Sequence, residues 1–545
     1  MPKFFRSGLR VVASFLFASL LFVQLAYTVK MAHQVSDDVS VTFARDNDGG
    51  VMIQTLIRQS HWTARNGWYA YGPVYYRVSH LIAKLDAALG SGIPSETTPS
   101  KHEEIAHFAL LLASILALFG ISCLLGWCAG SGFLSRVTAA LLINTLLLSH
   151  PVWVTWVFRP HPDILLTFLI TLGCLVSFLG WSESSKGART LLAAIAAVTF
   201  GVAIATKISG VYFFAAALVF FALPLSWSAV TIACLFVLLA VLGYFLIGFP
   251  QSLDISETFE FLRVYSRDGG GPPTVASTLA WFRSFFAQSY SVSLLILVLA
   301  PMFSRSQDSS RPQMANGSKN HWFICAFFVL SFGLLIRKEM FLPTQHYTLP
   351  YAAVFWLSEI FLLKHYIENT APNGKFHSKW REYTKRRWQL IGAFKALVMV
   401  AVFWSVFSGG DFLTTRAMSQ NLVQKMTCHE ETMTVKRKFS ELIASGKRIL
   451  ADPYVPSPRD PVSPGVVHNI WGVKFSILGD HDAIFTQKQR FYSRYQGSDD
   501  PGNYVRDDKE WEEKRVFYNF INGKSEFLDN EKKRWKLVLR DTLRF

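Results

Sequence analysis

Residues Ile105 to Trp127 read IAHFALLLASILALFGISCLLGW, an apolar run without lysine, arginine, aspartate or glutamate. An α-helix rises 1.5 Å per residue, so a run of this length crosses the hydrocarbon core of a bilayer. Similar runs of about 15 to 22 residues recur along the chain. They lie at Val11 to Val29, Leu134 to Leu148, Ile164 to Leu179, Leu191 to Ala205, Val211 to Trp227, Ala229 to Phe249, Tyr290 to Phe303, Trp322 to Ile336, Tyr347 to Leu363 and Leu390 to Phe407. The sequence therefore predicts a polytopic α-helical membrane protein with about eleven transmembrane helices.

The composition supports this interpretation. Of the 545 residues, 51% are hydrophobic and only 17% are charged, which is too apolar for a soluble chain of this size. A net charge of +16 would suggest nucleic-acid binding in a soluble protein. Here, however, lysine and arginine gather in short segments between the apolar runs, the pattern of cytoplasmic loops. We expect no nucleic-acid partner. Five of the six cysteines lie in or beside apolar runs, which argues against a disulfide framework.

The first apolar run, Val11 to Val29, has two interpretations. It could be a cleaved signal peptide, because basic residues precede it. It is longer than a usual signal core, however, and lacks an obvious small-residue cleavage site. We therefore expect an uncleaved first transmembrane helix.

Alternation of the predicted helices from a cytoplasmic N-terminus places three segments outside: 30–104, 250–288 and everything after Ser408. We therefore predict a transmembrane domain at residues 1–408, with 30–104 as its first outer loop. Residues 409–545 form the predicted second domain, a small soluble extracytoplasmic α/β domain.

Within the predicted second domain, two segments have the pattern of short buried strands and two have helical periodicity. The strands are expected at Arg448 to Asp452 and Ala483 to Gln487, and the helices at Glu431 to Gly446 and Glu510 to Gly523.

Carboxylates just beyond the ends of predicted helices are the first candidates for chemistry. Asp37 and Asp38 follow the first helix closely, and Asp163 opens the fourth. The simpler interpretations are solvated loop acids for the first two and a helix cap for Asp163. Alternatively, an outer cavity at the lipid boundary could hold Asp37 and Asp38. For Asp163, a role at the helix N-terminus and a role in chemistry are compatible.

Cations predicted on the same outer face are the second group of candidates. Lys207 lies between the fifth and sixth apolar runs, Arg159 follows the third, and His346 precedes the tenth. A lysine in such a place usually extends its ammonium to the interface. Together with Arg337 and Lys338, which are predicted on the same face, these three side chains could instead bind a phosphate at the membrane surface. The aromatic segment 66–76 is either an interfacial helix or one wall of a groove for a prenyl chain or sugar.

Five short motifs follow one another in a fixed order. They are Asp37-Asp38 with Ala44-Arg45 downstream, Gly72-Pro73-Val74-Tyr75-Tyr76, Arg159-Pro160-His161-Pro162-Asp163-Ile164-Leu165, Ala203-Ile204-Ala205-Thr206-Lys207 and His346-Tyr347-Thr348-Leu349-Pro350. In this order they resemble the motifs of the GT-C glycosyltransferases, specifically the protein O-mannosyltransferase and aminoarabinose transferase-like branch. Each motif is loose by itself, and the order carries the resemblance, which covers about Ser36 to Leu363. The family's first-loop motif is usually Asp-Glu, so the Asp-Asp pair here leaves open which carboxylate acts. The Trp-Trp-Asp-Tyr-Gly motif of oligosaccharyltransferases does not occur.

The resemblance implies an inverting glycosyltransferase that takes its sugar from a polyprenyl (dolichyl or undecaprenyl) phosphate. It implies Asp37, Asp38 and Asp163 as catalytic residues and Lys207, Arg159 and His346 as donor-phosphate ligands, without a metal or cofactor. The expected partners are the lipid-linked donor, a lipid, glycan or protein acceptor, and membrane lipids. The expected location is the bacterial inner membrane, with the site facing the periplasm. The main alternative is a multi-span transporter or flippase, which should carry ionisable residues near the bilayer midplane and paired repeats.

Overall fold

The structure is a computed structural model. It describes residues 3–37, 52–53, 56, 72–86, 99–130, 132–183, 185–222, 227–248, 275, 279, 282–283, 285–286, 289, 292–297, 348–370, 441, 444–446, 449–451, 466–468, 483–485, 516–519 and 526–529. The chain divides into two compact units. The first contains residues 1–33, 55–92 and 108–419, and the second contains residues 34–54, 93–107 and 420–545.

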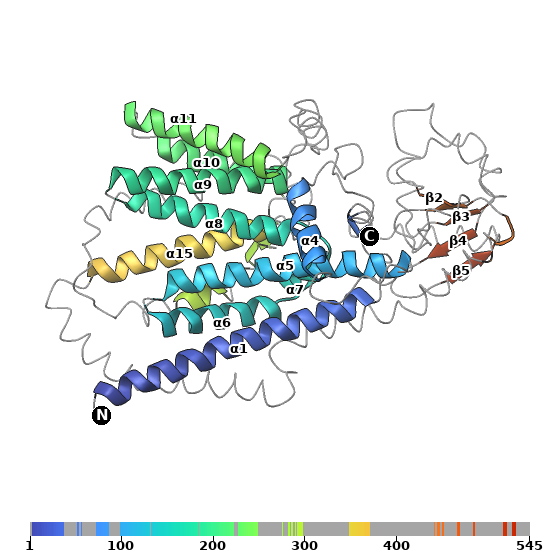
Figure 1. Cartoon of the computed structure of the whole chain (residues 1–545), viewed down its shortest axis with the longest axis horizontal. Helices are drawn as coiled ribbons and strands as arrows, with labels where there is room; N and C mark the ends of the chain where they lie inside the picture. The colour runs from blue at the N-terminus through green and yellow to red at the C-terminus, as the bar shows by residue number, and fades with distance from the viewer. Residues whose placement is uncertain are drawn as a thin grey trace. The chain divides into compact units, whose positions relative to one another are not determined.

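Helices build the described part of the first unit. They are α1 (Lys3–Asp37), α4 (Pro73–Asp86), α5 (Pro99–Ala129), α6 (Phe133–Ser149), α7 (Pro151–Val157), α8 (Asp163–Ser182), α9 (Lys186–Thr206), the 3-10 turn η2 (Ile208–Gly210), α10 (Val211–Ala222), α11 (Trp227–Leu242), the π-helical η3 (Gly243–Gly248) and α15 (Leu349–Thr370). α1 and α5 each include residues assigned to the second unit. Figure 1 shows the long helices with their axes nearly aligned and α4 crossing them steeply.

The aligned helices coincide with apolar runs that the sequence marked as membrane-spanning. Five described helical stretches are long and apolar enough to cross a bilayer: 11–33, 104–129, 163–181, 186–206 and 229–247. Three shorter apolar helices cover 133–149, 208–219 and 349–363. The predicted runs at 322–336 and 390–407 lie outside the described residues, so the total of eleven stays a prediction.

Close contact between the helices depends on small residues. At Gly201 in α9, an added Cβ would lie 2.1 Å from the Ala240 carbonyl oxygen of α11. Such a distance is impossible, so only glycine allows these two backbones to approach as they do. Large aromatic side chains fill other parts of the interior, where the ring centroids of Trp153 and Trp356 are 5.5 Å apart. α7 and α15, 200 residues apart in sequence, are thereby packed together.

The second unit contains short strands. A parallel sheet has the order β2-β1-β3, formed by β1 (Ile449–Ala451), β2 (Val466–His468) and β3 (Ala483–Phe485). β4 (Val516–Asn519) pairs antiparallel with β5 (Glu526–Asp529). The strands predicted around 448–452 and 483–487 are therefore confirmed.

The helix predicted at Glu510 to Gly523 is wrong in its central part, because β4 occupies Val516–Asn519. The segment Val-Phe-Tyr-Asn consists mostly of β-branched and aromatic residues, which favour a strand once a partner such as β5 is available. Strand pairing outweighed the local helical periodicity.

Candidate functional site

The centre of the candidate site is formed where α7 gives way to α8. Pro160 and Pro162 flank His161, and Pro162 is the N-cap of α8. Proline lacks a backbone N–H and disfavours helical geometry in the residue before it, which keeps this connection short and non-helical. Asp163 is consequently the first residue of α8 and not its N-cap, but its carboxylate lies in the first turn, where a negative charge is favourable.

Lys207 occupies the break between α9 and η2. Its backbone is extended, with φ −157° and ψ 135°, directly after the last helical residue, Thr206. The Lys207 N–H donates to the Ala203 carbonyl at 3.0 Å, and the Lys207 carbonyl accepts from the Gly210 N–H at 3.0 Å. The backbone polar groups at the break are thus satisfied while the helix ends.

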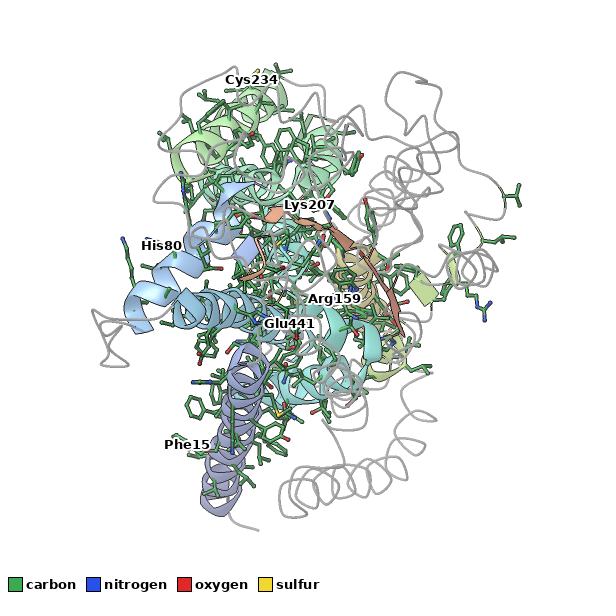
Figure 2. All side chains as sticks on the ribbon, turned by 90° about the vertical axis from the view of Figure 1, so that its right-hand side faces the viewer. Phe15, His80, Arg159, Lys207, Cys234 and Glu441 are labelled. Carbon is green, nitrogen blue, oxygen red and sulfur yellow. The ribbon has the colours of Figure 1, made fainter. Side chains whose placement is uncertain are left out.

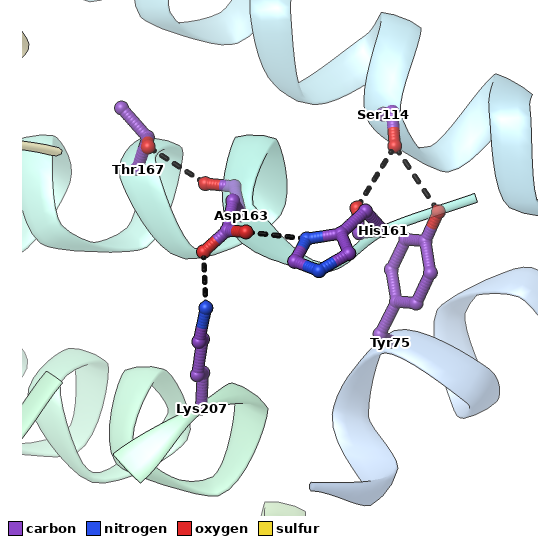
Figure 3. A network of polar contacts seen from close by, with 6 residues as sticks. All are labelled: Tyr75, Ser114, His161, Asp163, Thr167 and Lys207. Atoms are coloured by element: carbon purple, nitrogen blue, oxygen red, sulfur yellow. Dashed lines mark hydrogen bonds and ion pairs between the residues drawn. The ribbon is translucent and has the colours of Figure 1, made fainter. Parts of the chain in front are cut away.

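Lys207 and Asp163 form a buried ion pair. The Lys207 Nζ lies 2.8 Å from the Asp163 Oδ1, and their side chains are 1% and 2% exposed. The second carboxylate oxygen, Oδ2, contacts the His161 Nδ1 (Figure 3). Seen along the helices, Phe15 and Cys234 lie at the margin while Lys207 lies inside (Figure 2). The sequence-based interpretation of Lys207 as a snorkelling residue is therefore wrong.

The ion pair can exist here because each charge is compensated. Moving a single charge into a low-dielectric interior costs several kcal/mol even after relaxation of the protein. A carboxylate that contacts an ammonium with one oxygen and an imidazole with the other has a partner for each of its two oxygens. Removing one member of such a set leaves an uncompensated buried charge, which typically costs about 3–5 kcal/mol.

Trp156 links Arg159 to the same cluster. The Arg159 guanidinium lies 5.0 Å from the Trp156 ring centroid, a cation–π contact. The His161 ring meets Trp156 edge-on, at a centroid distance of 4.9 Å. One indole therefore orients both a predicted phosphate ligand and the histidine that contacts Asp163.

A hydrogen-bond chain connects the cluster to α4 and α5. The Tyr75 hydroxyl donates to the Leu110 carbonyl at 2.8 Å and lies 3.1 Å from the Ser114 Oγ. Ser114 in turn donates to the His161 carbonyl at 3.5 Å, and all three side chains are buried (Figure 3). The position of His161 therefore depends on α4, a helix that the apolar runs did not reveal.

α4 contacts other helices near its N-terminal end. The Gly72 N–H, just before α4, donates to the Thr206 carbonyl at 3.0 Å, which satisfies a carbonyl at the end of α9. A Cβ at Gly72 would lie 1.8 Å from the Ala205 carbonyl oxygen. Further along, the Arg77 Nη1 donates to the Ile247 carbonyl at 2.9 Å, and burial lowers the pKa of its guanidinium. Glycine before proline thus lets α4 meet α9 directly beside Lys207.

The structure brings together only some of the predicted site residues. Asp163 and Lys207 are in contact, and Arg159 adjoins them through Trp156. Asp37 is the last residue of α1, and its side chain lies outside the description, as do Asp38 and His346 entirely.

Sequence reasoning assigned no individual role to His161, Tyr75 or Ser114, although Tyr75 belongs to the aromatic segment 66–76. The first two belonged to quoted motifs, whereas nothing distinguished the serine. Among the described residues, no three histidine, cysteine, aspartate or glutamate side chains are grouped as metal ligands would be.

No protein-family model and no curated protein matches the chain. Among solved structures it is similar to ArnT from Cupriavidus metallidurans in the apo state, with 14% identity, a TM-score of 0.43 and coverage of 96% of this chain and 95% of that chain. The same ArnT bound to undecaprenyl phosphate gives 15% identity, a TM-score of 0.39 and coverage of 78% and 73%. The Archaeoglobus fulgidus oligosaccharyltransferase tethered with an acceptor peptide gives 12% identity and a TM-score of 0.29, with coverage of 85% of this chain and 62% of that chain. At these values the similarity carries neither a substrate nor a residue role to this chain.

Proposed function

We propose that the chain is a membrane glycosyltransferase that moves a sugar from a polyprenyl-phosphate donor to an acceptor on the extracytoplasmic side, with inversion. The observation that supports this most is the buried Lys207–Asp163 pair at the junction of apolar helices. A lipid-linked donor needs an apolar environment for its prenyl chain and a cation for its phosphate. Both are present at this junction, where α8 and α9 are long apolar helices.

In this proposal Lys207 binds the donor phosphate and Asp163 holds the lysine in place. An ammonium is a point charge with three N–H donors and forms charge-assisted hydrogen bonds with phosphate oxygens. Arg159, oriented by Trp156, and His346 contribute further positive charge. Charge develops on the departing phosphate in the transition state, and these cations stabilise it there.

The proposed general base is Asp37, with Asp38 as the alternative. The carboxylate accepts the proton of the acceptor hydroxyl, and the resulting oxygen nucleophile attacks the anomeric carbon. The bond between that carbon and the phosphate oxygen breaks, and the lipid phosphate leaves from the opposite face. The anomeric configuration is therefore inverted.

The test is incubation of the purified protein with a panel of radiolabelled polyprenyl-phosphate sugars, scoring release of lipid phosphate. We expect release with at least one donor, and loss of most of it in Asp37→Asn, because an amide keeps the shape but cannot take the proton. Activity of Asp37→Asn within about tenfold of the unmodified protein, with Asp38→Asn inactive, would move the base by one residue. Movement of the labelled lipid across vesicles without release of phosphate would favour the flippase alternative instead.

A further inference from the structure

A cluster of polar side chains lies between α1, α5 and α6, where the helices are otherwise apolar. Gln24 is near the middle of the candidate span 11–33 in α1. Its Nε2 donates to the Thr145 Oγ1 of α6 at 2.7 Å. Its Oε1 accepts from the Asn144 Nδ2 of the same helix at 2.8 Å. One amide thus makes a donor and an acceptor contact with two consecutive residues.

The cluster extends to α5 through Ser122, whose Oγ donates to the Asn144 Oδ1 at 3.3 Å. The side chains of Ser122 and Asn144 are fully buried and that of Thr145 is 5% exposed. We call these four residues, Gln24, Ser122, Asn144 and Thr145, the amide clamp. It joins three helices at a depth where lipid offers polar groups no alternative partner.

Apart from the clamp, α1 makes few contacts with the other helices. Only 17% of its candidate span is buried, and Phe15 and Phe22 are each 69% exposed. Its apolar contact with α6 is a small cluster around Phe17 and Leu141. Lipid tails are as apolar as these side chains, so burial of apolar surface does little to hold a helix in place there.

The clamp is specific for one rotation of α1. Sliding the helix by one residue along its helical path would rotate it by about 100° and move it by about 1.5 Å. Gln24 would then face lipid, and the amides of both Gln24 and Asn144 would lose partners. The clamp therefore selects one register of α1 against α6.

The register of α1 against α6 also determines where the C-terminal end of α1 lies. The His33 ring lies 5.4 Å from the Phe108 ring of α5, between centroids. Asp37 follows one helical turn later, about 6 Å along the axis. We propose that the amide clamp positions the end of α1 that carries Asp37, the base of the proposed function, on which this inference rests. Gln24 and Asn144 are then positioning residues that never contact substrate.

The experiment uses the full-length protein with its six native cysteines replaced and new cysteines at positions 33 and 108. Disulfide formation between the pair reports the register of α1 without requiring activity. It is measured in Gln24→Leu, Asn144→Leu, the double variant and a control, Phe22→Leu, which alters an exposed side chain at the same depth. Turnover and the KM for donor are measured on the same substitutions without the added cysteines.

We expect disulfide formation to slow several-fold in each single variant and no further in the double variant, because the two residues act through one interaction. Turnover should fall by about tenfold or more while the KM for donor stays within about threefold, since a small misplacement of a catalytic group reduces the rate of the chemical step. Phe22→Leu should change neither the rate of disulfide formation nor the turnover.

Unchanged disulfide formation in Gln24→Leu would overturn the clamp, whatever the activity. Slower disulfide formation with unchanged turnover in the clamp variants would show that the clamp holds α1 but does not position the base. That result would overturn the inference as well. Absence of lipid-phosphate release by the unmodified protein with every donor would instead overturn the proposed function, which the disulfide measurement does not depend on.

Discussion

Lys207 contributes to both stability and binding in the proposed site, and a single substitution changes the two together. Its ammonium compensates the buried Asp163 carboxylate at 2.8 Å, so its removal leaves that charge without its main partner. A loss of activity in a lysine variant would therefore not by itself demonstrate a phosphate ligand. Removing both charges separates the two contributions.

We predict that Lys207→Gln lowers the free energy of unfolding by about 3–5 kcal/mol, the usual cost of breaking a buried pair. The double variant Asp163→Asn with Lys207→Gln should recover most of that loss, because no uncompensated charge remains. Polyprenyl phosphate should nevertheless bind it more weakly than the unmodified protein, by about 1.5–3 kcal/mol for one charge-assisted hydrogen bond. Thermal unfolding in detergent and titration with polyprenyl phosphate measure the two effects.

Lys207→Arg provides the matched control for charge. It keeps the positive charge but replaces a compact ammonium with a planar fork, so we expect intermediate binding. Unchanged affinity for polyprenyl phosphate in a well-folded double variant would refute the phosphate role and leave the pair with a structural role alone.

Asp163 and Lys207 could be selected from the sequence because each stands beside an apolar run. Their contact could not, because they are 44 residues apart and meet only through the packing of α8 on α9. The lysine also follows a helix end where the backbone becomes extended, which directs its side chain inward. His161 was visible in its motif, but its role depends on a carboxylate and an indole that only the fold brings close.

At the scale of elements, long apolar runs predicted helices well because in lipid every backbone group must be satisfied within its own segment. α5, α8 and α9 begin and end within a few residues of the predicted runs, apart from the polar first turns of α5 and α9. α4 was harder to recognise, since it is short and carries charged residues. The aromatic segment 66–76, which overlaps the start of α4, favoured a helix at the membrane interface. Nothing in it predicted that α4 would contact the end of α9.

We predict that Gly72→Ala loosens the junction of α4 with α9. Its Cβ would lie 1.8 Å from the Ala205 carbonyl oxygen, so the backbones must separate and the hydrogen bond to Thr206 weakens. Overpacking of this kind costs about 1–3 kcal/mol. Because Lys207 is the next residue after Thr206, affinity for polyprenyl phosphate should fall together with the midpoint of thermal unfolding.

Gly187→Ala in α9 is the matched control, because nothing lies within 4 Å of its added Cβ. Alanine favours a helix over glycine, so this variant should be at least as stable as the unmodified protein. Equal stability and donor affinity in the two alanine variants would show that the junction is not under the steric constraint described.

At the scale of the whole molecule, the sequence predicted the helical unit and part of the strand-containing unit with unequal success. The strands β1 and β3 were identifiable as short apolar segments between polar ones. β4 was missed because the segment around it has helical periodicity, and its partner β5, only a short connection away, was missed with it. β2 was missed as well, and its three residues form a strand only by pairing with β1. The division at residue 408 and the location of each unit remain proposals that rest on the number of transmembrane helices.

The last prediction tests that number. Positive charge in the connections predicts a cytoplasmic N-terminus, and the predicted odd number of helices would then place the segment after Asp37 and the chain beyond Ser408 on the same outer face. Single cysteines at positions 45 and 431, in a protein without its native cysteines, should both react with a membrane-impermeant maleimide in intact cells. A cysteine at position 375, within a basic connection, should react only after permeabilisation. If 45 and 431 were labelled from opposite sides, the helix count would be wrong by one, and the segment beyond Ser408 would lie on the membrane face opposite to the loop that follows Asp37. That segment could then take no part in acceptor binding.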